Sequence, residues 1–340
     1  MNIGRVSLKE KVLVVAEIGN NHEGDFEVAR ELVKRAADAG VDAVKFQTFD
    51  TDHYVSRTDR ARHARLRSFE LSHAQFEELA QLARSLGLLF ISTPFDLRSA
   101  EFLQGIVDAF KIASGDNTFY PLLARVAKSG KPMVVSTGLA DLDGVERTVA
   151  FIRRQWQAHG IEGQLALLHC VSAYPVPPEQ ANLLAIRTLA ERFDCEVGYS
   201  DHTIGIEAAV LAVALGARVI EKHFTLEKRY SDFRDHQLSA DPSEMKELVE
   251  KVALASRLLG SPDKRVQPCE ADGVQTLRRS IVAARDLPKG HRLSAADLTW
   301  LRPAGGLVPG QEHELVGKAL RRDVTFGELL RQADVEEAGP

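Results

Sequence analysis

The sequence predicts an α/β fold, namely an eight-stranded (β/α)8 TIM barrel followed by a small C-terminal domain. From residue 12 to 258, short apolar runs alternate with amphipathic runs, which is typical of a parallel sheet covered by helices. The turn at 17–24 lacks the G-x-G-x-x-G motif that often follows the first strand of an open doubly wound sheet. The 340 residues suffice for a barrel of roughly 250 residues and a second domain.

The eight predicted strands are nearly continuous in Val, Ile, Leu and Ala, as expected for strands that are buried on both faces. They are Val12–Gly19, Ala43–Thr48, Leu88–Pro94, Ala109–Ser114, Pro132–Thr137, Leu165–Cys170, Glu196–Asp201 and Arg218–Thr225. Between them, Asp25 is expected to cap a helix that ends at Gly40, and Ser72 with Gln75 forms a capping box. Ser243 is expected to begin the last barrel helix, which ends at Gly260.

The domain organisation follows from composition and from an internal repeat. Residues 1–260 form the predicted barrel, and residues 261–279 are polar, contain two prolines and indicate a linker. In residues 280–340, Arg285–Gly290 returns as Arg322–Gly327 at an offset of 37 residues. Two copies of a strand–turn–short-helix unit predict a pseudo-twofold domain. A domain this small is only marginally stable alone, so we expect it to dock on another surface.

Composition excludes several classes of protein. A net charge of −5 without a basic stripe argues against a nucleic-acid binder, and no apolar run reaches the 18 residues needed to span a membrane. The start of the chain has no signal-peptide pattern, and three widely spaced cysteines fit a cytoplasmic protein. The densest basic cluster, Arg60, Arg62, Arg65 and Arg67, predicts a solvated helix or loop beside an active-site mouth, with attraction of a substrate anion as the less favoured alternative.

Polar residues gather at the C-terminal strand ends, where barrels carry their active sites. They are Glu17, Lys45, Gln47, Ser92, Thr93, Lys111, Ser114, Asp116, Ser136, Thr137, His169, Ser172, Ser200, Asp201, His202, Glu221 and His223. The two histidines end successive strands and either bind one divalent ion or are structural polar residues. Two lysines with several hydroxyls suit a phosphate dianion. The ring as a whole predicts a phosphorylated small molecule and a metal-polarised carbonyl.

Motifs along nearly the whole chain resemble the sialic acid (N-acetylneuraminate) synthase family. They are A-E-I-G-N-N-H-E-G-D (16–25), V-K-F-Q-T (44–48), S-T-P-F (92–95), K-I-A-S-G-D (111–116), S-T-G-L (136–139), L-H-C-V-S-A-Y-P (168–175), Y-S-D-H-T-I-G (199–205) and E-K-H-F-T (221–225). The end domain, with L-R-P-A-G-G (301–306), resembles the antifreeze-like SAF module of that family. The resemblance implies condensation of phosphoenolpyruvate with an amino-sugar aldehyde, which gives a nonulosonic 2-keto acid and phosphate.

The resemblance also implies roles for individual residues. Glu17, Asp116 and Asp235 would be catalytic; Lys45, Gln47, Lys111, Ser114, Ser136, Ser172 and Ser200 would bind phosphoenolpyruvate; Tyr174, Asp235 and Arg302 would contact the sugar; and His202 and His223 would bind Mn²⁺ or Mg²⁺, with Co²⁺ as an alternative. The implied assembly is a homodimer in which Arg302 of the end domain reaches the partner subunit's active site.

Three departures from the family pattern fall where the sugar would bind. Asp116 replaces the usual glutamate, Ser172 replaces an asparagine, and Tyr230–His236 replaces a G-P-D loop. They leave open a pseudaminic- or legionaminic-type acceptor or another aldehyde. The remaining alternatives are a synthase of shorter keto sugar acids, which would lack the end domain, and a non-catalytic sugar-binding scaffold.

Overall fold

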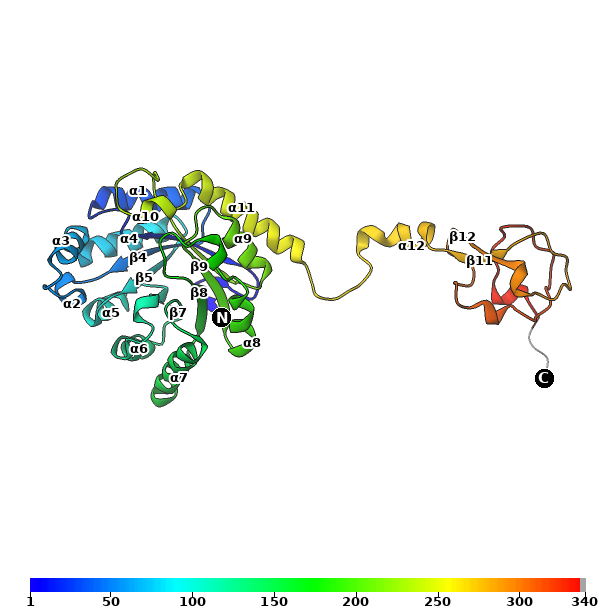
Figure 1. The fold of residues 1–340 in the computed structure, drawn as a ribbon, viewed down its shortest axis with the longest axis horizontal. Coiled ribbons are helices and arrows are strands. Elements are labelled where there is room, and N and C mark those ends of the chain that lie inside the picture. Colours follow the sequence, from blue (N-terminus) through cyan, green and yellow to red (C-terminus); the bar gives the residue numbers. More distant parts are fainter. Residues whose placement is uncertain (337–340) are drawn as a thin grey trace. The chain divides into compact units, whose positions relative to one another are not determined.

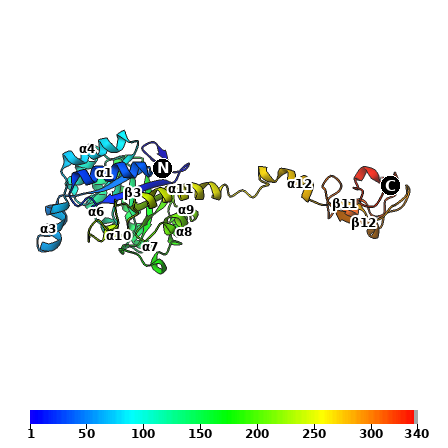
Figure 2. The same ribbon diagram turned by 90° about the horizontal axis from the view of Figure 1, so that it is seen from above.

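The computed structural model describes residues 1–336 and divides the chain into two compact units, Met1–Gly260 and Ser261–Pro340. The first unit is a closed barrel of eight parallel strands surrounded by helices (Figures 1 and 2), which confirms the predicted fold. The strands follow chain order around the barrel, and β10 pairs with β3 to close it. They are β3 (Leu13–Gly19), β4 (Ala43–Thr48), β5 (Leu89–Pro94), β6 (Ala109–Ile112), β7 (Met133–Ser136), β8 (Leu165–Cys170), β9 (Glu196–Asp201) and β10 (Val219–His223).

The first unit also contains helices α1 to α11. They are α1 (Phe26–Asp38), α2 (Thr51–Tyr54), α3 (Arg60–Phe69), α4 (His73–Ser85), α5 (Leu97–Leu103), α6 (Tyr120–Ala127), α7 (Leu142–His159), α8 (Ala185–Arg192), α9 (Glu207–Ala214), α10 (Asp235–Leu238) and α11 (Pro242–Leu259). None of the helices in residues 1–336 is long and apolar enough to cross a membrane.

The N-terminal ends of three helices can be compared with the predicted N-cap residues. Asp25 caps α1 by accepting hydrogen bonds from the backbone of Glu27 and Val28, and the capping box of Ser72 and Gln75 begins α4, as predicted. The prediction that Ser243 begins α11 is wrong, because Asp241 is the N-cap. Its carboxylate accepts from the Ser243 and Glu244 backbone amides, and Pro242 occupies the first turn, where its missing amide hydrogen costs nothing.

The barrel unit has two main apolar cores, and the second of them closes one end of the barrel interior. The larger core lies between the strands and the helices and includes the stacked pair Phe46 and Phe90, with ring centroids 5.6 Å apart. The second core fills the barrel interior and includes Ile3 and Leu8, both fully buried, beside Leu13. Ile3 belongs to a hairpin of β1 (Asn2–Ile3) and β2 (Val6–Ser7) that was not predicted. Because this hairpin fills the barrel interior at the N-terminal ends of the strands, the open cavity lies at their C-terminal ends.

The second unit has the predicted pseudo-twofold pattern. Its strands β11 (Ser280–Ala283) and β12 (Leu298–Leu301) are antiparallel, and they pack on a small core of leucine, isoleucine and valine. The contacts repeat at the offset of 37 residues: Arg285 bonds Asp297 as Arg322 bonds Asp334, and the bridge Val282↔Leu329 has its counterpart in Arg292↔Ala319. The second copy forms isolated bridges in place of full strands. The segment predicted as a linker contains α12 (Ala271–Leu277).

Candidate active site

A cavity of about 1020 Å³ opens at the C-terminal ends of the barrel strands. Ligand pockets commonly measure roughly 300–1,000 Å³, so this one has room for two small substrates. All the barrel residues to which the family resemblance assigns a role line it: Glu17, Lys45, Gln47, Lys111, Ser114, Asp116, Ser136, Ser172, Tyr174, Ser200, His202, His223 and Asp235. Arg302 belongs to the second unit, where its side chain is exposed.

Strand alternation explains which strand-end residues reach the cavity. Successive side chains of a strand point to opposite faces, so residues two apart share one face. Ser200 with His202, and Glu221 with His223, therefore face the cavity together. Asp201 and Lys222, which lie between these residues in the sequence, do not line the cavity. Ser92, Thr137, His169 and Asp201 point away and have partners of their own, which are Phe46, Leu168, Ala181 and Lys222. These four strand-end residues are structural.

Two lysines and two glutamates form a buried cluster at the base of the cavity. Lys45 Nζ lies 3.0 Å from Glu17 Oε1 and 3.3 Å from Glu221 Oε1, and Lys111 Nζ lies 3.6 Å from the same Glu221 oxygen. Lys111 also donates to Ser136 Oγ at 2.7 Å, and Ser200 Oγ donates to Glu221 at 2.9 Å. Glu221 thus joins residues that sequence motifs had assigned to phosphoenolpyruvate. Sequence reasoning noted it at a strand end and gave it no role.

The cluster shifts the pKa values of its two carboxyl groups in opposite directions. Burial raises the pKa of Glu17 and the nearby Glu221 charge adds to this, while Lys45 opposes it. Burial acts on Glu221 in the same direction, but Lys111 and Lys45 outweigh it and hold the pKa of Glu221 below its usual range. Glu17 Oε2 is buried and has no hydrogen-bond partner within residues 1–336. Glu17 is therefore the carboxyl group suited to hold and release a proton toward the cavity.

His202 and His223 lie side by side, with ring centroids 5.3 Å apart. Nδ1 of His202 is 2.8 Å from the Val171 carbonyl oxygen, which leaves its Nε2 free for a ligand. Nδ1 of His223 is buried without a hydrogen-bond partner among the described residues, and burial holds the pKa of His223 well below its usual value. A neutral imidazole with an unused nitrogen is the form that binds metal ions.

The residues present fit a sparsely liganded metal ion. No group of three or more His, Cys, Asp or Glu side chains in residues 1–336 forms a metal-binding cluster. The histidine pair could therefore supply two ligands, with Asp235 Oδ2 3.9 Å from His223 Nδ1 and the remaining positions left to water and substrate. An open coordination sphere is typical of catalytic rather than structural metal sites.

The side of the cavity near Gly138 is a narrow cradle. Ser114 Oγ accepts a hydrogen bond from the Gly138 amide at 3.1 Å, and a Cβ atom at Gly138 would lie only 2.6 Å from both Ser114 Oγ and Ser172 Oγ. Ser172 Oγ is buried without a partner among the described residues. Beside this cradle, burial raises the pKa of Asp116 to about 6. The Ser114 and Ser172 hydroxyls, which lie close together here, suit an anionic oxygen.

The loop predicted to differ, 230–236, contributes residues 231–235 to the lining of the cavity. Arg234 lies over the Tyr174 ring at 4.6 Å and approaches Asp235 Oδ1 at 3.3 Å. Tyr174 in turn stacks on His202, with ring centroids 4.2 Å apart. Burial raises the pKa of Asp235. An aromatic ring, a cation and a carboxyl group beside the histidines are suited to a polar, uncharged ring or chain such as a sugar.

The mouth of the cavity is bordered by α2 and α3. Tyr54, Arg62, Arg65, Leu66 and Phe69 line it there. The predicted basic cluster therefore lies on a helix beside the mouth, and its exposed arginines are solvated as expected.

Comparisons with known proteins agree with this geometry. The chain matches the NeuB family model over residues 32–264 and the SAF domain model over residues 278–336. It is 40% identical to the N,N'-diacetyllegionaminic acid synthase of Legionella pneumophila, over 95% of this chain and 94% of that protein. It is 35% identical to the mouse N-acetylneuraminate-9-phosphate synthase, over 96% and 93%. The crystal structure of a Leptospira borgpetersenii N-acetylneuraminic acid synthetase in complex with citrate superposes with a TM-score of 0.76 at 32% identity, covering 81% of this chain and 94% of that one.

Proposed function

We propose that this chain, which belongs to the NeuB family, condenses phosphoenolpyruvate with the aldehyde of an open-chain N-acylated amino sugar. The products are a nonulosonic 2-keto acid and phosphate, so the enzyme is a transferase that forms a carbon–carbon bond. The observation that carries the proposal is the cavity, which combines a buried lysine pair with histidine and glutamate atoms that have no hydrogen-bond partner within residues 1–336. The named relatives are synthases of such acids, which supports the same reaction class.

Phosphoenolpyruvate is placed at the base of the cavity. Lys45 and Lys111 bind its anionic groups together with Gln47, Ser114, Ser136, Ser172 and Ser200, all of which line this region. The Ser114 and Ser172 hydroxyls support this placement, since both line the cavity and Ser172 Oγ is buried without a partner among the described residues. Glu221 keeps both lysines charged and in position before the substrate arrives.

His202 and His223 would hold a divalent ion, Mn²⁺ or Mg²⁺ with Co²⁺ as an alternative. When bound there, the ion supplies Lewis-acid polarisation of the aldehyde oxygen. Tyr174 and Asp235 orient the sugar so that its aldehyde carbon faces C3 of phosphoenolpyruvate.

The bonds change in two stages. C3 of the enol attacks the aldehyde carbon, and Glu17 gives its proton to the aldehyde oxygen as that oxygen becomes a hydroxyl. The cationic C2 then accepts water, whose proton passes to a nearby carboxylate such as Asp116 or Asp235. The hydroxyl of the tetrahedral centre then gives its proton to the departing phosphate as the bond between C2 and the phosphate oxygen breaks, which leaves the 2-keto acid and inorganic phosphate.

The acceptor and the assembly are the finer parts of the proposal. The relatives named above act in the synthesis of different acids, one of them a 9-phosphate, and the changes at Asp116, Ser172 and the 230–236 loop fall where the acceptor binds. Alternatives are a pseudaminic- or legionaminic-type precursor or another aldehyde. In the proposed homodimer, Arg302 of the SAF domain contacts the acyl group in the partner subunit's cavity.

The test measures phosphate release from phosphoenolpyruvate by metal-loaded protein with a panel of N-acylated hexosamines. We expect release that depends on both an acceptor and a divalent ion, and we expect a chelator to stop it. His223→Ala should abolish metal-dependent turnover and lower the bound metal content, while His159→Ala, at an exposed helix end, should change neither. Arg302→Ala should chiefly raise the KM for the sugar. Metal-loaded protein that releases no phosphate with any aldehyde would refute the proposal.

A further inference from the structure

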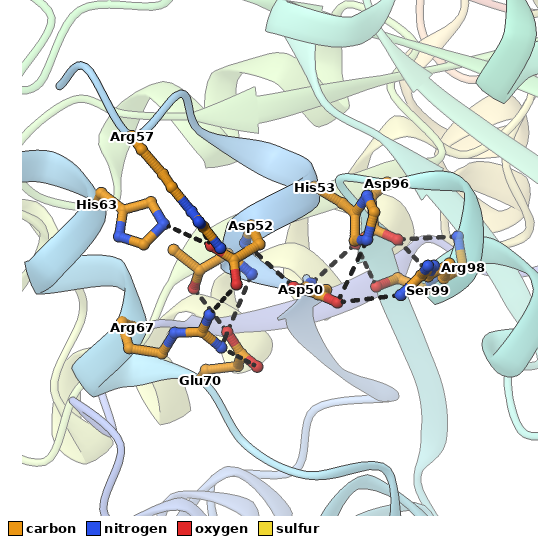
Figure 3. A network of polar contacts seen from close by, with 11 residues as sticks. Asp50, Asp52, His53, Arg57, His63, Arg67, Glu70, Asp96, Arg98 and Ser99 are labelled. Atoms are coloured by element: carbon orange, nitrogen blue, oxygen red, sulfur yellow. Dashed lines mark hydrogen bonds and ion pairs between the residues drawn. The ribbon is translucent and has the colours of Figure 1, made fainter. Parts of the chain in front are cut away.

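The basic residues of helix α3 and of the segment just before it lie in two environments. Figure 3 shows that Arg57, His63 and Arg67 surround Asp52, with Arg57 Nε at 2.9 Å and His63 Nε2 at 3.0 Å from Asp52 Oδ1. Arg67 contacts Asp52 as well and also lies 3.3 Å from both carboxylate oxygens of Glu70. None of these three side chains lines the cavity. The two arginines are matched by carboxylates outside the site.

Arg62 and Arg65 behave differently. They are three residues apart and thus share one face of α3, and both line the cavity. Neither makes a salt bridge within residues 1–336. The guanidinium of Arg62 lies 5.6 Å from the centroid of the Tyr54 ring, and its Nη2 is 3.4 Å from the Tyr54 hydroxyl. The helix therefore presents two uncompensated cations to the mouth of the cavity.

The helix that carries them is firmly seated. Leu66 and Phe69 pack with Phe49 and Val55 in a separate apolar cluster above the strands. A Cβ atom at Gly24 would lie 2.0 Å from the Ser68 carbonyl oxygen, so the loop after β3 is pressed against the end of α3. Because the backbone is fixed on both sides, the arginine pair is preorganised rather than carried on a loose loop.

The other charged groups of the mouth do not cancel this pair. Glu23 is occupied, since it accepts a hydrogen bond from Ser231 and lies 2.9 Å from His236 Nε2. Arg234 offsets Asp235, and Asp232 is the exposed carboxylate that remains on the loop side. Asp116 is the carboxyl group that acts on Tyr54 together with Arg62, and the two arginines exceed it by one positive charge.

We infer that Arg62 and Arg65 bind a phosphate group carried by the acceptor at the end remote from its aldehyde. The inference rests on the proposed function and names the acceptor class as N-acylated hexosamine phosphates. Phosphoenolpyruvate already has its own lysines at the base of the cavity, so a second cationic site in the same cavity calls for a second anion. An acceptor whose aldehyde lies at the histidines extends its other end toward the mouth. Paired guanidinium groups suit a phosphate there, because each offers a fork of donors.

The experiment compares epimeric N-acetylhexosamines in pairs, each with and without a 6-phosphate, by phosphate release from phosphoenolpyruvate in the full-length metal-loaded protein. We expect kcat/KM to favour the phosphorylated member of the accepted pair by about 10-fold or more. The double change Arg62→Gln with Arg65→Gln should lower that preference by about 10- to 100-fold. Arg60→Gln is the matched control, because Arg60 is on the same helix and does not line the cavity. Thermal unfolding of each variant reports whether it folds.

A second measurement uses inorganic phosphate as the probe. It should inhibit competitively with the acceptor in the unsubstituted protein, and this competition should weaken in the double variant. Equal kcat/KM for both members of the accepted pair, or a preference that survives in the double variant, would overturn the inference while leaving the proposed function standing. No phosphate release with either member of any pair would refute the proposed function, and the inference with it.

Discussion

The change Glu221→Gln tests the buried charge cluster, because it removes one charge while keeping the shape of the side chain. Glu221 Oε1 is 3.3 Å from Lys45 Nζ and 3.6 Å from Lys111 Nζ. A glutamine at this position can still accept the Ser200 hydrogen bond, so the loss is electrostatic. Lys45 keeps Glu17 as a counter-ion, and the hydrogen bonds of Lys111 that remain within residues 1–336 go to the Ser136 hydroxyl and the Ile112 carbonyl.

The expected loss of stability in Glu221→Gln follows from these distances. At an effective dielectric constant of about 20, two unit charges roughly 3.3 Å apart attract by about 5 kcal/mol. Part of this attraction offsets the cost of burying the carboxylate, and removing one partner of a buried pair typically costs about 3–5 kcal/mol. We expect the free energy of unfolding to fall by about 3 kcal/mol, which lowers the Tm of the barrel by about 6–12 °C. The deficit should shrink as the pH rises, because Lys111, whose pKa burial already lowers, can then lose its proton.

Thermal and urea unfolding measure this loss, with and without phosphoenolpyruvate. The substrate supplies the missing negative charge, so it should raise the Tm of the variant more than that of the unsubstituted protein. Glu247→Gln is the control, since Glu247 makes the same kind of ion pair at the exposed surface, 2.6 Å from Lys251, and should cost less than about 1 kcal/mol. If Glu221→Gln is as stable as this control, the lysines do not depend on Glu221 and the reasoning fails.

Two further changes test the walls of the cavity. Burial raises the pKa of Asp116 from 3.8 to about 6, so the folded state loses stability as the pH rises through that window. After allowance for partial exposure, Asp116→Asn should raise the free energy of unfolding by about 1–2 kcal/mol at pH 7.5 and leave it unchanged below pH 4. An equal gain at both pH values would contradict this origin. Gly138→Ala places a methyl group 2.6 Å from Ser114 Oγ and Ser172 Oγ, so we expect KM for phosphoenolpyruvate to rise about 10-fold or more, whereas Gly105→Ala, where the nearest atom is 3.7 Å away, should leave it unchanged.

The barrel could be predicted because each strand is a continuous apolar run, and the start of α1 could be predicted because its capping residue precedes an apolar stripe. The start of α11 was misplaced because D-P-S-E offers two capping residues, and only the structure shows that Asp241 accepts the bonds. The hairpin at β1 and β2 was missed because two-residue strands carry no detectable period.

For the site, strand ends marked the right region but not the direction of each side chain. Ser92 and Asp201 adjoin cavity residues and face the other way, which only the register of the closed barrel decides. The role of Glu221 depends on its contacts with Lys45 and Lys111, which lie 176 and 110 residues away in the chain and leave no local signal. The pairing of Arg67, which sets it apart from Arg62 and Arg65 on α3, likewise depends on Asp52 and Glu70, which come from outside the helix.

The proposed reaction forms a carbon–carbon bond between phosphoenolpyruvate and a sugar aldehyde. The most direct measurement is the ¹³C NMR spectrum of the product made from phosphoenolpyruvate labelled at C3 and an accepted hexosamine labelled at C1. We expect a one-bond coupling between the two labelled carbons, together with one phosphate released per product. Phosphate release without this coupling would mean that the cavity hydrolyses phosphoenolpyruvate or transfers its phosphate, and it would contradict the account.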